Sequence, residues 1–498
     1  MSPHLETAPR SADLKRVVIE PVTRVEGHGK VTLLMDEANR IRQVRLHIVE
    51  FRGFEKFIQG RPYWEIPVMV QRLCGICPVS HHLAAAKAVD MLVGARRIPP
   101  TAEKLRRLLH LGQTLQSHAL HFFHLSSPDL LFGFDSPVAK RNIIGVIEAH
   151  PDLAVKGVKL RKYGQEVIRV LSGKRVHGTF ALPGGVNKAL SAADQDVLLK
   201  DIDQVVAWSQ EAVALARQVF FSNAEFHQHF GHFKSNFLSL IAEDGALDLY
   251  DGGLRARDPE GKPIFDHVDY RHYDRHIQEE VKDWSYMKFP FISSLGAEEG
   301  WYRVGPLARV NNADRIPTPL AEAERKAYRA AGDGSHVHAS LAYHWTRMIE
   351  MLHAAEGIRE LLGDPEILGT DLVATGDRVF EGVGLVEAPR GTLFHHYKVG
   401  EHDMIEKANL IVSTTNNNQA MNTAVRSVAS RYLDGRNLTE GLLNHIEVAI
   451  RAYDPCLSCA THALGQMPLR VELRDAEGAL VDALAREEDG ALRRGGEA

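Results

Sequence analysis

Strict alternation of apolar and polar residues marks the first structured part of the chain. Every second position is apolar in two neighbouring stretches, at Val31, Leu33 and Met35 and again at Val44, Leu46 and Ile48. The polar residues 36–39 separate the two stretches, so the pattern predicts two strands that are joined by a turn in a β-hairpin. An apolar run at 17–22 predicts one more strand just before this hairpin.

A helical period of three to four residues dominates the rest of the chain. It is clearest after Pro99 and Pro100, where one apolar stripe consists of Leu105, Leu108, Leu109, Leu115 and Phe122. We expect Thr101 to cap this helix and Glu103 to lie in its first turn. Further helices are predicted at 82–93, 140–172, 194–221, 341–355 and 443–452.

Short apolar alternations predict small β units in the later part of the chain, at 245–273, 381–397, 408–415 and 469–473. The fold class that we predict is α+β and mainly α, with a helical bundle core, an N-terminal β-hairpin or sheet and small β insertions. No repeat or clear linker interrupts the pattern. We therefore expect a flexible arm at 1–16 and a single domain over 17–462.

Composition limits the function without naming it. The 498 residues are 44% apolar and 25% charged, as in an ordinary globular enzyme, and the formal net charge is −5. So small a charge gives no footprint for nucleic acid or for a membrane surface. The first 16 residues lack the apolar core of a secretory signal, and no apolar run is long enough to span a bilayer. We expect a cytoplasmic protein with reduced cysteines.

All four cysteines fall into two short pairs near opposite ends of the chain. Cys74 and Cys77 form one Cys-x-x-Cys step, and Cys456 and Cys459 form the other. Such a step turns two sulfurs toward one point, and four thiolates are a soft donor set that favours zinc, iron–sulfur clusters, copper or nickel. We predict that the two pairs meet at one metal centre across a folded core.

Three plainer interpretations compete with this centre. Two structural disulfides would need an oxidising compartment, and nothing in the sequence suggests export. A structural zinc site with four cysteines usually has closely spaced pairs in a compact ribbon. A redox dithiol needs one pair rather than two.

Two histidine clusters are also candidate metal ligands. They are His227, His229 and His232 and, further on, His336 and His338. Neither cluster has the i, i+4 histidine pair with a glutamate base that is typical of a metalloprotease helix. We interpret both as surface or core histidines.

With their flanking residues, the two cysteine pairs resemble the large subunit of nickel–iron hydrogenases. The first pair matches Arg-x-Cys-Gly-x-Cys-x-x-x-His at 72–81, and the second matches Asp-Pro-Cys-x-x-Cys-x-x-His at 454–462. Further blocks match in family order at 24–28, 52–55, 183–186 and 388–391. Stretches at 49–57, 284–290 and 452–467 most resemble the soluble, bidirectional NAD-reducing members. Deazaflavin-reducing and heterodisulfide-linked hydrogenases are the alternative relatives.

The resemblance implies a nickel ion held by Cys74, Cys77, Cys456 and Cys459. Cys77 and Cys459 would also bridge to an iron that carries two cyanides and one carbon monoxide. Thr414 would hydrogen-bond to a cyanide, and Pro389 would contact the same group. Thiolates suit such a centre because they are strong, soft donors that metal binding keeps deprotonated.

The resemblance also implies catalytic roles. Cys456 would accept a proton when H2 splits heterolytically, and Glu26 would relay it outward, since a carboxylate near a buried thiolate can have a pKa raised toward neutrality. Arg390 would overhang the metals, paired with Asp454, and polarise H2 or orient a cyanide. A structural salt bridge is the alternative for this pair. The family often has an aspartate where this chain has Ser117, so carboxylate support around Arg390 is weaker here.

A magnesium site and a maturation step follow from the same resemblance. Glu55, His462 and the backbone carbonyl of Leu410 match a family magnesium site, which would orient the cysteines. Family large subunits are cleaved just after the histidine that matches His462. We therefore expect 463–498 to be a tail that is removed after nickel insertion, with its charged, glycine-rich part at 486–498 disordered.

The implied reaction needs partner subunits. No cysteine remains for iron–sulfur clusters, and no glycine-rich dinucleotide fingerprint follows a strand. The resemblance implies a flavin diaphorase and an iron–sulfur small subunit, whose FMN and clusters pass electrons from H2 to NAD+, and also a maturation protease and nickel-insertion factors. We expect no nucleic acid partner and no direct membrane span. A zinc-structured binding protein and a metal-free scaffold subunit remain as other classes.

Overall fold

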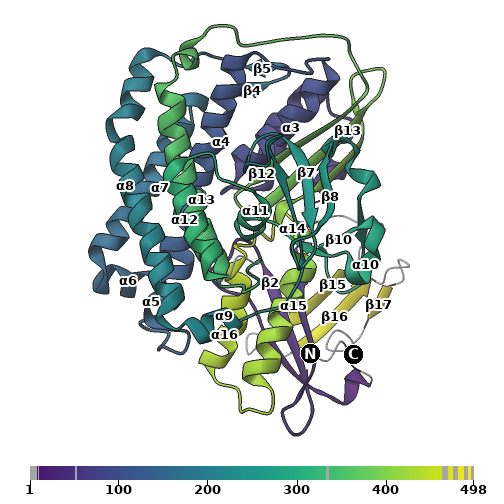
Figure 1. The fold of residues 1–498 in the computed structure, drawn as a ribbon. Coiled ribbons are helices and arrows are strands. Elements are labelled where there is room, and N and C mark those ends of the chain that lie inside the picture. Colours follow the sequence, from purple (N-terminus) through teal and green to yellow (C-terminus); the bar gives the residue numbers. More distant parts are fainter. Residues whose placement is uncertain are drawn as a thin grey trace.

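Four long helices pack side by side along one flank of the molecule (Figure 1). They are α4 (Pro100–Leu120), α7 (Pro151–Ser172), α8 (Ala192–Ser222) and α13 (Ala342–Gly363). The computed structural model describes residues 8, 10–50, 53–332, 336–461, 469–474, 480–486 and 492–494. Helix α13 is buried on nearly every side, as expected for a helix at the centre of a core. It still carries buried charged residues, which the functional site uses.

Shorter helices surround this bundle and join it to the sheets. They are α1 (Phe54–Phe57), α2 (Ile66–Met69), α3 (Pro78–Leu92), α5 (Ser127–Phe132), α6 (Ile143–Ala149), α9 (Ala224–His229), α10 (Gly296–Glu299), α11 (Pro306–Asn312), α12 (Pro319–Ala331), α14 (Ser413–Asn416), α15 (Asn418–Val428) and α16 (Glu440–Ala452). Two of them lead into or out of the cysteine pairs, because α3 begins after Cys77 and α16 ends before Cys456.

The N-terminal strands form an antiparallel sheet in the order β1 (Lys15–Ile19), β2 (Gly29–Met35) and β3 (Ile41–Ile48). Val31 pairs with Leu46 and Leu33 pairs with Val44, and all four side chains are fully buried. The period of two in the sequence therefore marks the face that packs on the core. The predicted hairpin is confirmed.

The central sheet holds one side of the functional site. Its antiparallel strands are β12 (Glu381–Ala388), β13 (Gly391–Val399) and β14 (Ile405–Ile411). Helix α3 lies directly on β12, where a Cβ atom on Gly384 would come within 2.0 Å of the carbonyl oxygen of Ala84. Glycine is needed there for the close approach. This contact fixes the start of α3 beside the turn between β12 and β13.

The remaining sheets are small insertions. One has the order β11 (Tyr302–Arg303), β6 (Asn236–Ile241), β7 (Gly253–Arg257) and β8 (Pro263–Val268). Two others are pairs, formed by β9 (Ile277–Glu280) with β10 (Phe289–Ile292) and by β4 (Ala181–Leu182) with β5 (Gly185–Val186). The predicted class, mainly α with small β insertions, is confirmed.

Local expectations were wrong at three places. Thr101 is not the cap of α4, because the helix begins one residue earlier and the Thr101 hydroxyl donates to the carbonyl of Glu366. The helix expected over 140–172 is divided at His150, where Pro151 starts α7 without needing a free N–H. Part of the segment expected to be disordered forms β17 (Leu492–Arg494).

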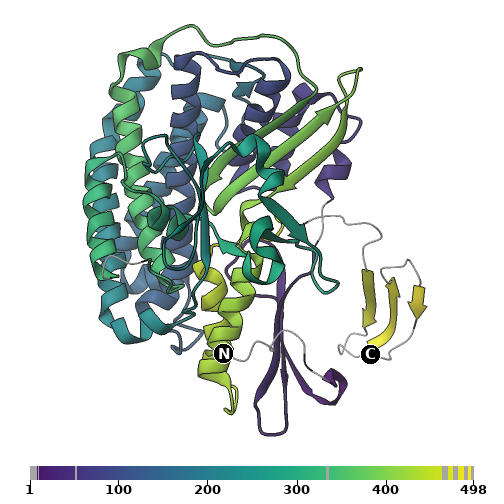
Figure 2. The same cartoon turned by 45° about the vertical axis from the view of Figure 1, so that its right-hand side comes forward.

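The last strands belong to a sheet of their own. β15 (Leu469–Arg474), β16 (Leu480–Arg486) and β17 pair antiparallel with one another, and Figure 2 shows these yellow strands apart from the helical body. The expected arm at 1–16 overlaps β1 by two residues. Among the described residues, no helix combines the length and apolar character needed to cross a bilayer.

Candidate metal centre

The four cysteine sulfurs converge on one buried point. All four Sγ atoms lie within 4.8 Å of one another, and none of the four residues forms a disulfide. The Sγ atom of Cys456 lies 3.3 Å from that of Cys74 and 2.6 Å from that of Cys459. Sulfurs bound to a single ion at about 2.3 Å lie at most about 4.6 Å apart, so this group has the size of one metal site.

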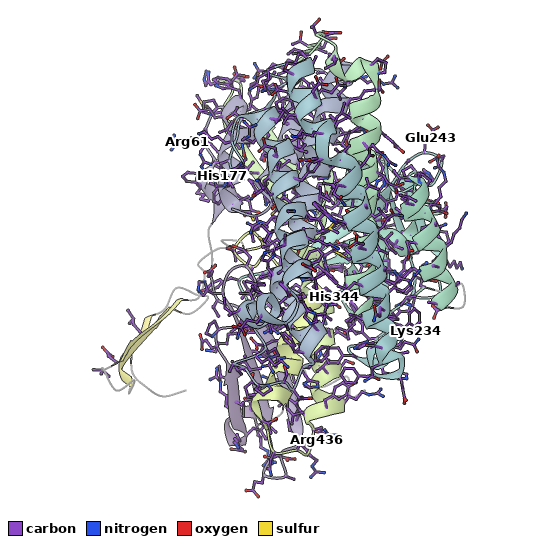
Figure 3. All side chains as sticks on the ribbon, turned by 90° about the vertical axis from the view of Figure 1, so that its left-hand side faces the viewer. Arg61, His177, Lys234, Glu243, His344 and Arg436 are labelled. Atoms are coloured by element: carbon purple, nitrogen blue, oxygen red, sulfur yellow. The ribbon has the colours of Figure 1, made fainter. Side chains whose placement is uncertain are left out.

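The N-terminal pair lies at a junction between a loop and a helix. Cys74 follows the 3-10 turn Val70–Leu73, and Cys77 is the N-cap residue of α3. The Sγ atom of Cys74 accepts hydrogen bonds from the backbone N–H groups of Ile76 and Cys77 at 3.2 and 3.1 Å. Backbone N–H groups at such a junction stabilise negative charge on sulfur. The edge of this loop is held by His177, whose Nε2 lies 2.9 Å from the carbonyl oxygen of Cys74 and which Figure 3 labels at the molecular surface.

The C-terminal pair is held against the N-terminal loop 24–28. Cys456 forms a parallel β-bridge with Glu26, and the N–H of Leu457 donates to the Glu26 carbonyl at 2.9 Å. Gly27 has a φ of +83°, and a Cβ atom there would lie 2.6 Å from the backbone nitrogen of Ser458. The glycine therefore permits both the turn and the close approach that the sequence indicated.

The Glu26 side chain connects the sulfurs with the half-buried rim of the site. Its Oε2 accepts a hydrogen bond from the Cys456 thiol at 2.9 Å and another from the Ser458 N–H at 3.3 Å. Its Oε1 is hydrogen-bonded to the Ser458 hydroxyl. Sequence reasoning did not single out Ser458, whose hydroxyl continues this chain of polar groups.

A buried arginine–aspartate pair lies on another side of the sulfurs. The Arg390 guanidinium donates from Nε to the carbonyl of Asp454 at 2.5 Å and from Nη2 to Oδ1 of Asp454 at 3.0 Å. Its Nη1 lies 3.4 Å from the hydroxyl of Ser117, a longer contact. Burial raises the pKa of Asp454, although the charge of Arg390 opposes the shift. The Oδ2 atom of Asp454 has no hydrogen-bond partner within the described chain.

A second arginine, Arg347 on α13, faces the same aspartate. It donates from Nη1 to backbone carbonyls, at 3.3 Å to Tyr343 and at 3.1 Å to Ala452. Its Nε and Nη2 are without partners among the described atoms. Burial lowers its pKa to about 10, and the Asp454 charge acts in the opposite direction. Sequence reasoning missed Arg347, because no motif marks it.

A cavity of about 10 Å³ adjoins the sulfurs, which is room for about one water-sized group. Its walls are formed by Cys77, His81, Ala388, Pro389, Arg390, Leu393, Val412, Ser413, Thr414, Cys456 and Cys459. The Thr414 hydroxyl accepts a hydrogen bond from the Cys456 N–H at 3.0 Å, so its own O–H remains available as a donor. The structure thus brings Pro389, Arg390 and Thr414 together at the sulfurs.

The thiols differ in their tendency to ionise. Burial raises the pKa of Cys456 and Cys459, because a thiolate there loses its hydration. The pKa of Cys77 is lowered instead, by hydrogen bonds with Cys456 and the other two thiols and with His81. Four adjacent thiolates in a buried site require a cation to offset their charge, so the donor set fits a soft metal.

The expected magnesium ligands are only partly described. The Oε1 atom of Glu55 accepts a hydrogen bond from the Leu410 N–H at 3.2 Å, so these two residues are neighbours. The contact uses the amide of Leu410, whereas the expected ligand is its carbonyl. His462 lies outside the described residues.

The histidine clusters do not form metal sites in the described chain. His227 Nδ1 lies 3.0 Å from the carbonyl of Phe220, and His338 stacks on the ring of Phe237. The four cysteines are the one group of three or more cysteine, histidine or carboxylate residues of metal-site size that the described ranges contain. The interpretation of both clusters as core or surface histidines is supported.

Comparison with protein families places the chain among proteins with such a site. A family model described as nickel-dependent hydrogenase matches residues 52–132 and 232–462, and a model described as HoxL-like matches residues 16–51. Together they cover both cysteine pairs and the loop that carries Glu26.

Individual relatives match along almost the whole length. The β subunit of the NAD-reducing hydrogenase HoxS from Cupriavidus necator is 49% identical over 95% of this chain and 100% of its own. The matching polypeptide of the F420-non-reducing hydrogenase from Methanothermobacter thermautotrophicus is 41% identical over 94% of this chain and 99% of its own length.

Solved structures agree with these matches. A crystal structure of an NAD+-reducing [NiFe]-hydrogenase in the H2-reduced state has a TM-score of 0.89 and 55% identity, covering 90% of this chain and 99% of that one. The Ni-Fe-Se hydrogenase of Desulfovibrio vulgaris Hildenborough has a TM-score of 0.72 at 24% identity, which supports the fold alone.

Proposed function

The chain belongs to the nickel-dependent hydrogenase family, and on that premise we propose that it is the catalytic subunit that splits H2 reversibly into protons and electrons. One observation carries the proposal: sulfurs from opposite ends of the chain meet at one buried point, with Glu26 in contact with one of them. A structural zinc site needs the sulfurs but has no use for such a carboxylate.

The residues present fit a nickel–iron group. Nickel would be held by Cys74, Cys77, Cys456 and Cys459. Cys77 and Cys459 would also hold an iron with two cyanides and one carbon monoxide, because both line the small cavity beside the sulfurs. Arg390 and Thr414 offer N–H and O–H donors to cyanide there, while Pro389 supplies an apolar wall. When bound, this centre supplies the site at which H2 is cleaved.

The protein's own groups would carry the proton. Cys456 is the sulfur that contacts a carboxylate, with 2.9 Å between its Sγ and Oε2 of Glu26. A proton held on this sulfur can pass to Glu26 and then to the hydroxyl of Ser458 at the other carboxylate oxygen. The path leads from a buried atom to the half-buried rim.

Arg390 would provide fixed positive charge at the reacting centre. Two hydrogen bonds to Asp454 hold its guanidinium, which lines the cavity, so no reorganisation is needed during the reaction. Asp454 acts here as the residue that positions Arg390.

A magnesium ion would support the cysteines from outside. Glu55 and Leu410 are neighbours at β14, and His462 would complete the site from the C-terminal side. The hydrogen bond from Leu410 to Glu55 already orients the carboxylate. Such an ion would connect the chain after Cys459 to the central sheet.

Electrons would leave through other subunits. This chain uses all four of its cysteines at one centre, so none is left for a cluster. Because the Cupriavidus necator relative belongs to an NAD-reducing hydrogenase, we propose that NAD+ is the final acceptor. A flavin diaphorase and an iron–sulfur small subunit, with FMN and further clusters, would complete the path, in the cytoplasm.

The tail would be removed during maturation. The family model ends at residue 462, and the strands after it pair only with one another in the described chain. A maturation protease would cut after His462 once nickel-insertion factors have loaded the site, removing 463–498. Intact-mass measurement of the active enzyme tests this step, because an attached tail in active protein would contradict it.

The main experiment replaces Glu26 by glutamine in the complex purified with its partners. We expect H2 oxidation and H/D exchange to fall at least about 100-fold, because the amide cannot take up a proton. Nickel and iron contents should stay at the wild-type level. The matched control is Glu20→Gln, an exposed carboxylate just before the same loop.

Three results would overturn the proposal. Zinc alone in the purified wild-type chain would assign a structural site, and the absence of metal from it would assign a scaffold. Unchanged H/D exchange in the Glu26→Gln complex would remove Glu26 from the proton path.

A further inference from the structure

A line of buried side chains runs from Cys77 into the central sheet. His81, one helical turn after Cys77, lines the same cavity and hydrogen-bonds to the Cys77 sulfur. Its Nδ1 lies 3.1 Å from Nε2 of His395 on β13. The Nδ1 of His395 lies 2.6 Å from the hydroxyl of Tyr397 on the same strand. The three side chains are at most 1% exposed, so no bulk water competes for these contacts.

Such a line has two possible directions. A neutral imidazole has one N–H donor and one bare nitrogen that accepts. In one direction Tyr397 donates to His395, His395 donates to His81, and His81 then directs an N–H at sulfur. In the other direction every donor is reversed, and His81 presents a bare nitrogen to the sulfur.

The sulfur selects between these directions. A metal-bound cysteine is a thiolate, which accepts hydrogen bonds and donates none. A bare nitrogen against it would place two lone pairs together in a buried site. Only the direction that begins at the Tyr397 hydroxyl gives every group in the line a partner.

We propose that Tyr397 is a positioning residue, which fixes the tautomers of His395 and His81 and so directs an N–H of His81 at the sulfur of Cys77. The inference rests on the proposed function, in which Cys77 binds both metals. Hydrogen bonds to a metal-bound sulfur withdraw electron density from it and raise the reduction potential of the centre. Tyr397 thereby tunes the metals although it touches neither of them.

The ionisation of the groups agrees with this direction. Burial holds the pKa of His395 well below its usual range, so its ring is neutral and its tautomer matters. Burial and the charge of Glu55 raise the pKa of Tyr397, so its hydroxyl keeps its proton. The Glu55 carboxylate is a competing acceptor for that proton, and it already accepts from the Leu410 N–H.

The neighbouring residue on β13 provides a matched control. His396 points to the other face of the strand, where its Nδ1 lies 3.2 Å from the hydroxyl of Tyr273. Tyr273 is also buried. Tyr273→Phe therefore removes the same kind of contact between tyrosine and histidine from the same strand, without a link to a cysteine.

The experiment compares Tyr397→Phe, His395→Phe and Tyr273→Phe with the wild type, each as the complex with its partner subunits. Infrared spectra of the iron-bound carbon monoxide and redox titrations of the nickel signal report the electron density of the centre. We expect both Tyr397→Phe and His395→Phe to move the carbon monoxide band to lower wavenumber and the midpoint potential to a more negative value. Tyr273→Phe should match the wild type in both.

Each outcome decides one point. A wild-type complex without a carbon monoxide band would contradict the proposed function itself. A wild-type band that Tyr397→Phe leaves in place would overturn only the present inference, as would an equal shift in Tyr273→Phe. Failure of both line variants to load nickel and iron, while Tyr273→Phe loads them, would also overturn it, because the inference assigns the line to tuning and not to assembly.

Discussion

Two buried arginine clusters lie close together in this molecule, and they differ in how completely they are hydrogen-bonded. In the first, Arg309 on α11 donates to both carboxylate oxygens of Glu350 and to Glu387, at 2.5 to 2.6 Å. No polar atom of these three side chains lacks a partner. In the second, at the cysteines, Oδ2 of Asp454 and two nitrogens of Arg347 have no partner in the described chain.

The clusters also differ in charge. One guanidinium faces two carboxylates at Arg309, whereas Arg390 and Arg347 share the single carboxylate of Asp454. The excess of positive charge lies beside the cysteine sulfurs, where thiolates and anionic metal ligands would balance it. A buried polar group without a partner in a native fold calls for an explanation, and a missing anionic centre provides one here.

The satisfied cluster supports the other. Arg309 also donates at 3.1 Å to the carbonyl of Ala388, in the turn that presents Arg390 to the sulfurs. Glu387 on β12 is held by the Thr392 hydroxyl across the same turn. Position is therefore fixed by a cluster that performs no chemistry, and charge is supplied by the cluster beside it.

The largest expected effect comes from breaking the satisfied cluster. Arg309→Met leaves Glu350 and Glu387 buried without their cation, which should lower the free energy of unfolding by about 3–5 kcal/mol. Urea unfolding of the purified protein measures this loss. Arg169→Met is the control, since its pair with Glu166 is partly exposed and should contribute less than about 1 kcal/mol. Equal losses in the two variants would contradict the distinction.

Arg390→Lys tests the other cluster and should change rate rather than stability. Lysine keeps the charge but cannot hold both contacts with Asp454, so the donor at the cavity is misplaced. We expect H2 turnover at equal nickel content to fall about 100- to 1,000-fold, which is about 3–4 kcal/mol of barrier. The unfolding free energy should change by about 1 kcal/mol or less. A loss of stability without a loss of turnover would assign Arg390 a purely structural role.

The comparison shows which part of the site the sequence can predict. The cysteine pairs, Glu26 and Arg390 lie in short motifs whose spacing carries information, and the structure brings them together. Arg309 and Glu387 carry no local signal, because their contact depends on how α11 packs against β12. His395 and Tyr397 show only the period of two of a strand, and their link to His81 exists only after α3 lies on the central sheet.

Acidification should weaken the satisfied cluster through His118, whose Nε2 lies 2.8 Å from Glu350. Burial lowers the pKa of His118 to about 4, from 6.5. Between these values the unfolded chain binds the proton and the folded chain does not, so stability falls as pH falls from 6.5 to 4. The limit of this effect is about 3 kcal/mol. Urea unfolding at each pH should show a shallower fall for His118→Gln, and an unchanged pH slope would contradict the neutral histidine.

The smallest expected effect comes from adding a carboxylate where positive charge is in excess. Ser117→Asp places an anion next to Nη1 of Arg390, which lies 3.4 Å from the serine hydroxyl. Two guanidiniums would then face two carboxylates, so the new charge is paired and stability should change by about 1 kcal/mol or less. Turnover should fall less than tenfold, because Arg390 keeps its contacts with Asp454 and only the field at the sulfurs weakens. Ser117→Asn, which adds similar volume without charge, is the control. A loss above about 3 kcal/mol in the aspartate variant alone would mean that the cluster at the cysteines has no positive charge to spare.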